Sequence, residues 1–172
     1  MSEPNKNVLG IPGPEVIAEA RALIDSADHA ALATLEPLSG DPLATRVGLA
    51  SFADGTPFII ASALTLHSAA LAADPRCSLL IGLVGKGDPL AHPRITLKCR
   101  AELIEVGSAI AADARARYLE KHPRAAIYVD LPDFRFFRLA VLRARFNAGF
   151  GQAYEIDAAE LVSAPRGSTS PP

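Results

Sequence analysis

Cysteine, net charge and long apolar runs are all scarce in this chain of 172 residues. The two cysteines, Cys77 and Cys99, lie in separate apolar stretches, and two such residues make neither a disulfide framework nor a metal-binding pattern. The formal net charge is only −2, which gives no sign of a nucleic-acid or membrane surface. No apolar run approaches the roughly 18 residues that a membrane span needs. We therefore expect a globular protein with buried, reduced thiols.

The amino-terminal residues also lack the features of a signal peptide. MSEPNKNVLG has no basic start followed by an apolar core. Together with the reduced cysteines, this predicts a cytoplasmic location. The chain is long enough for one domain with its own core, which we expect over residues 13–163. A flexible leader over 1–12 and a disordered tail over 164–172, rich in Pro, Ser and Gly, are expected to flank it.

Several familiar catalytic motifs are missing. Residues 85–89 (GKGDP) lack the rest of a P-loop, and residues 149–151 (GFG) lack the third glycine of a dinucleotide fold. No GxSxG nucleophile motif is present. No metal site is therefore predicted, because the four histidines also lack a metal-binding spacing: His29, His67, His92 and His122.

Apolar periodicity and turn signals predict the secondary structure. Helices are expected over 13–28, 65–73 and 109–122, with a short one at 124–128. Strands are expected over 29–35, 43–52, 57–61, 76–84, 94–106 and 134–146, with a further segment at 154–156. Most neighbouring strands are joined by hairpins or short connections. The predicted fold is therefore mainly β, of the α+β class, with six antiparallel strands forming a barrel and helices flanking it.

The strand 43–52 carries the first candidate ligand residue. Side chains alternate between the two faces of a strand, so Arg46 shares its face with Ala44, Gly48 and Ala50. These small neighbours leave room around the guanidinium group, whose fork can donate two parallel hydrogen bonds to a phosphate. A solvated surface arginine would give the same pattern, so both interpretations stay open.

The turn after the strand 57–61 carries the second candidate. Ser62, Thr65, His67 and Ser68 gather at the start of a predicted helix. The free N–H groups and the dipole of a first helical turn favour an anion. Thr65 is also a good N-cap residue, so ordinary helix capping is the alternative.

Taken in order, these pieces resemble the FMN-binding split β-barrels of the pyridoxamine 5′-phosphate oxidase-like superfamily. The matching pieces are residues 42–45, Ser62, the pair His67-Ser68, and DPRCSL at 74–79. GDPLAHPRITLKCRAE (87–102) and FNAGFGQA (146–153) further resemble the haem iron utilisation branch. The resemblance covers residues 13–160 and implies a split six-stranded barrel.

The resemblance also implies a homodimer with FMN bound at the interface, acting as a flavin-dependent oxidoreductase on an unidentified small molecule. By position, one strand would contact the flavin or its phosphate, the turn would line the ring edge or ribityl chain, and the helix start would hold the phosphate. A further arginine would reach the partner's flavin, and two residues would lie at the rim. The implied cofactor-binding residues are Thr45, Arg46 and Val47 on the strand; Ser62, Ala63 and Leu64 in the turn; His67 and Ser68 at the helix start; Arg94 as the further arginine; and Phe150 and Gly151 at the rim.

The pair His67-Ser68 departs from the Arg-Lys pair that pyridoxamine phosphate oxidases usually have. The chain is thus expected to be a relative of these oxidases rather than one of them. A phosphate raises the pKa of a neighbouring histidine, so FMN affinity is expected to weaken above about pH 7 as His67 loses its proton.

Three functions remain open from the sequence. The first is an FMN-dependent oxidoreductase, in which the catalytic residues are unknown and only His92 and Tyr128 are acid–base candidates. The second is a non-catalytic flavin or haem binder for storage, sensing or delivery. The third is an interaction module that has lost its cofactor.

Overall fold

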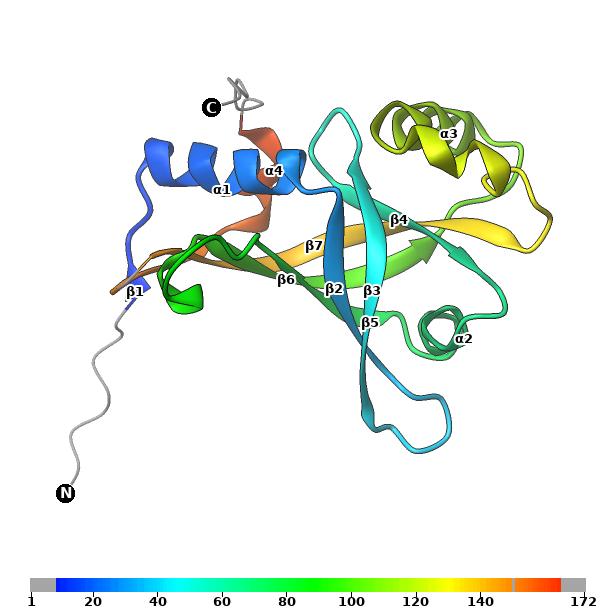
Figure 1. Ribbon diagram of the computed structural model, residues 1–172, viewed down its shortest axis with the longest axis horizontal. Coiled ribbons are helices and arrows are strands. Elements are labelled where there is room, and N and C mark those ends of the chain that lie inside the picture. Colours follow the sequence, from blue (N-terminus) through cyan, green and yellow to red (C-terminus); the bar gives the residue numbers. More distant parts are fainter. Residues whose placement is uncertain (1–8, 150, 165–172) are drawn as a thin grey trace.

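The computed structural model describes residues 9–149 and 151–164 of the chain (Figure 1). Six strands pair in the closed order β7-β4-β3-β2-β5-β6-β7, which makes an antiparallel barrel and confirms the predicted fold. Two more strands extend the edge, because β8 pairs with β7 and β1 pairs with β8. The strands are β1 (Leu9–Gly10), β2 (His29–Leu35), β3 (Pro42–Ser51), β4 (Pro57–Ser62), β5 (Arg76–Ile81), β6 (Arg94–Leu103), β7 (Phe134–Gly149) and β8 (Gln152–Ile156).

Helices flank the barrel rather than cross it. In Figure 1, α1 and α4 lie together at one side, α3 lies above β4, and α2 lies at the opposite edge from α1. No helix in the described part of the chain is long and apolar enough to cross a membrane. The helices are α1 (Pro14–Ser26), α2 (Leu66–Ala73), α3 (Ala109–Lys121) and α4 (Ala158–Ser163), with 3-10 turns η1 (Pro89–Ala91) and η2 (Pro123–Ile127).

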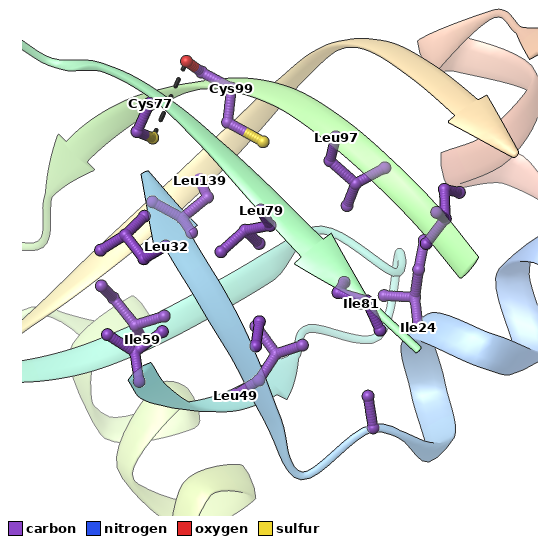
Figure 2. Close-up of a cluster of buried hydrophobic side chains, with 14 of the residues drawn as sticks. Ile24, Leu32, Leu49, Ile59, Cys77, Leu79, Ile81, Leu97, Cys99 and Leu139 are labelled. Carbon is purple, nitrogen blue, oxygen red and sulfur yellow. Dashed lines mark hydrogen bonds between the residues drawn. The ribbon is translucent and has the colours of Figure 1, made fainter. Parts of the chain in front are cut away.

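Aliphatic side chains fill the barrel interior (Figure 2). Burial alternates along β5 and β6, as it must when one face of a strand looks inward. Cys77 and Cys99 face each other across these strands, and both are buried and free, as expected. Burial raises the pKa of the Cys77 thiol to about 11, so the thiol stays protonated at neutral pH. The fully buried aliphatic residues on the barrel strands include Leu32, Leu49, Ile59, Leu79, Ile81, Ile95, Leu97 and Leu139.

A second apolar cluster attaches α3 to the outside of the barrel. Phe58 and Ile60 of β4 pack with Tyr118 of α3 in this cluster, and the rings of Phe52 and Phe58 lie 4.5 Å apart. Because these residues lie on the outer side of β3 and β4, they fix the helix over that face. This packing forms one wall of the pocket described below.

A buried arginine joins three segments at the other end of the barrel. Arg21 of α1 is 1% exposed. Its guanidinium donates to Asp25 at 2.9 Å, to the Asp54 carbonyl at 3.2 Å, and to the carbonyls of Val162 and Ala164 at 2.9 and 3.1 Å. These bonds hold α1 against both the β3–β4 turn and the end of α4.

The element boundaries differ from the sequence prediction in a few places. β5 ends at Ile81 rather than 84, and Leu83 and Val84 are exposed. The register of β5 on β6 would place Leu83 opposite Pro93, which has no N–H group to continue the ladder. β7 continues to Gly149 because residues 144–149 pair with β8 across a bulge, although a bend was expected from Asn147.

Two short elements at the ends of the domain were not predicted. β1 uses Leu9 and Gly10, which fall in the expected leader, and it pairs with Ala153 and Tyr154. α4 is only one or two turns long and begins where the Asp157 carboxylate accepts from the Ala159 N–H at 2.8 Å. The rest of the expected leader and tail, residues 1–8 and 165–172, lies outside the described residues.

Candidate functional site

A pocket of about 200 Å³ lies where β3, the β4–α2 turn and the α3–η2 segment meet. It gathers four of the residues implied by the resemblance and the acid–base candidate Tyr128. Its lining consists of Arg46, Val47, Gly48, Ile60, Ala61, Ser62, Thr65, His67, Tyr118, Tyr128 and Phe134. Strand β3 and the helix start, which were separate features of the sequence, therefore contribute to one site.

Arg46 supplies the only formally charged side chain in the lining, unless His67 is protonated. It is exposed on β3 and makes no ion pair or side-chain hydrogen bond with residues 9–149 or 151–164. The free space expected beside it is smaller than the sequence indicated. Tyr118 reaches over Gly48 from α3, and Ala50 is buried under the same helix.

The start of α2 has free main-chain donors. Thr65 occupies the N-cap position, as predicted, but its side chain accepts no hydrogen bond there. The Thr65 hydroxyl instead donates to the Ser62 carbonyl at 2.8 Å. The Ser68 N–H donates to the Thr65 carbonyl at 3.1 Å, whereas the N–H groups of Leu66 and His67 have no partner among the described residues and remain available to an anion.

Asp133 fixes the β4–α2 turn, although no sequence signal marked it. The Ser62 hydroxyl donates to the Asp133 carboxylate at 2.5 Å, and the Ala63 N–H donates to the Asp133 carbonyl at 2.8 Å. The Leu64 N–H in turn donates to the Ser62 Oγ at 3.1 Å. The loop before β7 thus holds the turn that leads into α2.

His67 is the one histidine whose ring has no hydrogen-bond partner in the described part of the chain. The ring of His29 contacts Asp28. The ring of His92 contacts the Lys86 carbonyl, and that of His122 contacts the Leu49 carbonyl. Burial lowers the pKa of His67 below its ordinary value. The ligand-free protein therefore presents a neutral, unengaged imidazole in the pocket at neutral pH.

Aromatic side chains form part of the pocket lining. The rings of Tyr128 and Phe134 stack with centroids 5.0 Å apart. Burial, and next a hydrogen bond with Tyr128, raise the pKa of Tyr118, so this phenol stays protonated. Sequence reasoning missed Tyr118, and the available signal was its helical spacing from the buried Ala114.

The remaining candidates lie outside this lining in the single chain. Thr45 points to the other face of β3 from Arg46, as strand alternation requires, and its Oγ1 is buried without a partner among the described residues. Ser68 is buried and lines a neighbouring cavity, whereas Ala63 and Leu64 are exposed beside the pocket. Arg94 donates to the carbonyls of Leu90 and His92 at 2.9 and 3.3 Å.

The last two candidates follow β7. Gly151 is exposed in the turn to β8 and does not line the pocket. Phe150 lies outside the described residues.

A comparison with protein families matches residues 16–148 to the pyridoxamine 5′-phosphate oxidase family. The chain belongs to this family. The chloroplastic haem oxygenase HOZ of Arabidopsis thaliana is 31% identical over 139 residues, which are 80% of this chain and 42% of HOZ. The chain therefore spans well under half the length of that relative.

Two solved structures share the fold and much of the sequence. A haem-binding protein from Mycobacterium smegmatis is 33% identical with a TM-score of 0.79, over 92% of this chain and 63% of that one. Protein Atu2129 of Agrobacterium tumefaciens is 38% identical with a TM-score of 0.75, over 86% of this chain and 60% of that one. The family's structural neighbours thus include haem-binding proteins, in agreement with the haem utilisation resemblance.

Proposed function

We propose that this protein binds haem in the pocket beside α2. The supporting observation is the presence of His67 and Arg46 in one pocket. A neutral, unengaged imidazole is the form in which histidine ligates haem iron. An unpaired arginine suits a haem propionate, because it can donate two hydrogen bonds to a carboxylate. Two relatives above 30% identity are described as a haem oxygenase and a haem-binding protein.

We infer that the binding unit is a homodimer. The pocket of about 200 Å³ in one chain is smaller than the roughly 300–1,000 Å³ of typical sites for organic ligands. Leu64 and Leu66, which flank the start of α2, are 89% and 69% exposed. Apolar side chains at the mouth of an undersized pocket fit a site that a second copy completes. Arg94 would act from that copy, whereas Phe150 and Gly151 would lie at the rim of the site.

An FMN-dependent oxidoreductase is the second candidate. The uncapped start of α2 and the free Arg46 also suit a phosphate, and the family match supports a flavin. In that case the flavin would supply the redox chemistry, while Arg46, His67 and the main-chain N–H groups would hold its phosphate. The free, buried cysteines support a reducing, cytoplasmic location for either function.

Titration of the purified protein with hemin and, separately, with FMN tests these two candidates. We expect hemin to bind with the Soret spectrum of a histidine-ligated haem, and His67→Ala to abolish that spectrum. His29→Ala is the matched control, because the ring of His29 contacts Asp28 and does not line the pocket. Hemin that does not bind, or that binds His67→Ala with an unchanged spectrum, contradicts the proposal. Loss of the Soret band with a reductant and oxygen would distinguish degradation from storage.

A further inference from the structure

The hydroxyl groups of Ser62 and Thr65 already donate hydrogen bonds within the protein. The Ser62 hydroxyl donates a hydrogen bond to the Asp133 carboxylate at 2.5 Å, and the Thr65 hydroxyl donates one to the Ser62 carbonyl at 2.8 Å. A hydroxyl group has a single proton to donate. Donors for an anion in the pocket are therefore Arg46, the main-chain N–H groups of Leu66 and His67, the His67 ring and the tyrosine hydroxyls of the lining.

Asp133 also places a negative charge one hydrogen bond away from the pocket lining. Its carboxylate contacts Ser62, and Ser62 lines the pocket together with Arg46 and His67. The acid thus partly offsets the single fixed positive charge of the lining. The Coulomb energy of this repulsion scales with the charge of the ligand. It is about twice as large for a phosphate monoester, which carries about −1.5 to −2 at pH 7, as for a carboxylate.

We propose that Asp133 determines the ligand class of this pocket, favouring carboxylate groups such as haem propionates over the phosphate dianion of FMN. The proposal rests on the proposed haem-binding function and assigns a specificity role to a residue outside the pocket lining. Asp133 is a positioning residue as well, since its main-chain carbonyl holds the Ala63 N–H. Its charge and its hydrogen bond can be separated by mutation.

Asp133→Asn removes the negative charge of Asp133 but keeps an oxygen that can accept the hydrogen bond from the Ser62 hydroxyl. The probe is inorganic phosphate, and the readout is the amide chemical shifts of Leu66 and His67 at low ionic strength. We expect the dissociation constant for phosphate to fall by at least about threefold. Asp130→Asn is the matched control, because Asp130 lies three residues earlier and pairs with Arg115 at 2.6 Å. An unchanged constant for Asp133→Asn, or an equal fall for Asp130→Asn, overturns the proposal.

Flavins provide a second readout that isolates the phosphate group. Riboflavin lacks the phosphate of FMN, so the affinity ratio of FMN to riboflavin should rise in Asp133→Asn while hemin affinity changes by less than about twofold. An unchanged ratio, or an equal rise for both flavins, counts against the proposal. Failure of the wild-type protein to bind hemin would instead contradict the haem-binding function and leave the phosphate comparison valid. If Asp133→Asn does not fold, Asp133→Ser removes the same charge and retains a hydrogen-bonding group.

Discussion

The side-chain hydroxyl of Tyr118 lies in the space that a Cβ atom at Gly48 would occupy. Tyr118 comes from α3 and Gly48 from β3, so the contact joins the helix to the barrel directly beside the pocket. Tyr118 is 2% exposed and also packs on the ring of His122, with centroids 4.4 Å apart. The position of this tyrosine therefore depends on the absence of a side chain at Gly48.

Gly48→Ala is expected to destabilise the protein by about 1–3 kcal/mol, the usual cost of overpacking a buried contact. In an unobstructed strand, replacing glycine by alanine stabilises by a few tenths to about 1 kcal/mol. The expected change in the free energy of unfolding is therefore opposite in sign to that of glycine-to-alanine changes in an unobstructed strand. Urea denaturation of the wild-type and variant proteins measures the difference in the free energy of unfolding.

The Tyr118→Phe background provides the control for this prediction. Removing the hydroxyl leaves the Tyr118 Cζ as the nearest atom, 3.3 Å from the new Cβ position. Gly48→Ala should then be almost neutral in the double variant. Equal destabilisation in both backgrounds would show that the hydroxyl contact is not the cause.

Arg46→Ala should weaken hemin binding roughly tenfold, the lower end of the effect of losing hydrogen bonds to a charged group. The low end is appropriate because Arg46 is exposed. Arg117→Ala is the control, since Arg117 lies on α3, pairs with Asp113 at 2.9 Å and does not line the pocket. Titration of each protein with hemin measures the affinities. Equal affinities for Arg46→Ala and the wild type would place the anionic groups elsewhere.

The pH dependence of ligand binding distinguishes the two roles of His67. Burial places the pKa of His67 below its ordinary value in the free protein. If the neutral ring ligates haem iron, protons compete with the metal. Hemin affinity should then stay constant above about pH 6.5 and fall as the pH falls through the lowered pKa. Spectroscopic titrations between about pH 5 and 8.5 measure it, with His67→Gln as the reference.

The opposite sign is expected if His67 holds a phosphate. A bound phosphate raises the pKa of the imidazole, so binding takes up a proton. FMN affinity should then be highest at low pH and fall as the pH rises from the lowered pKa of the free protein to the raised pKa of the complex. A flat profile for both ligands would remove His67 from either role.

The barrel could be predicted from the sequence because its strands have clear local signals. Inward and outward residues alternate along β5 and β6, and hairpin turns separate several of the strands. The strand ends were harder to predict, since they depend on the partner strand. Pro93 ends the pairing beyond Ile81, and β8 extends β7 to Gly149, but neither effect is visible within one strand.

The pocket could be predicted only in part, for a related reason. Arg46, Ser62 and His67 belong to local patterns. Tyr118, which lines the pocket, and Asp133, which contacts Ser62 of the lining, come from segments distant in sequence. A tyrosine on an amphipathic helix and an aspartate before a strand have no distinctive spacing. Their roles depend on contacts across the fold, with Gly48 and Ser62 respectively.

Arg21→Ala should destabilise the protein by about 3–5 kcal/mol, because it leaves Asp25 without its buried partner and three carbonyls without a donor. Arg117→Ala breaks a more exposed ion pair of the same i,i+4 spacing and should cost under about 0.5 kcal/mol. Urea denaturation compares the two variants. Amide hydrogen exchange should also accelerate in α4, whose end Arg21 holds through Val162. Equal losses in the two variants, with unchanged exchange in α4, would mean that Arg21 does not fasten the carboxyl-terminal helix to the barrel.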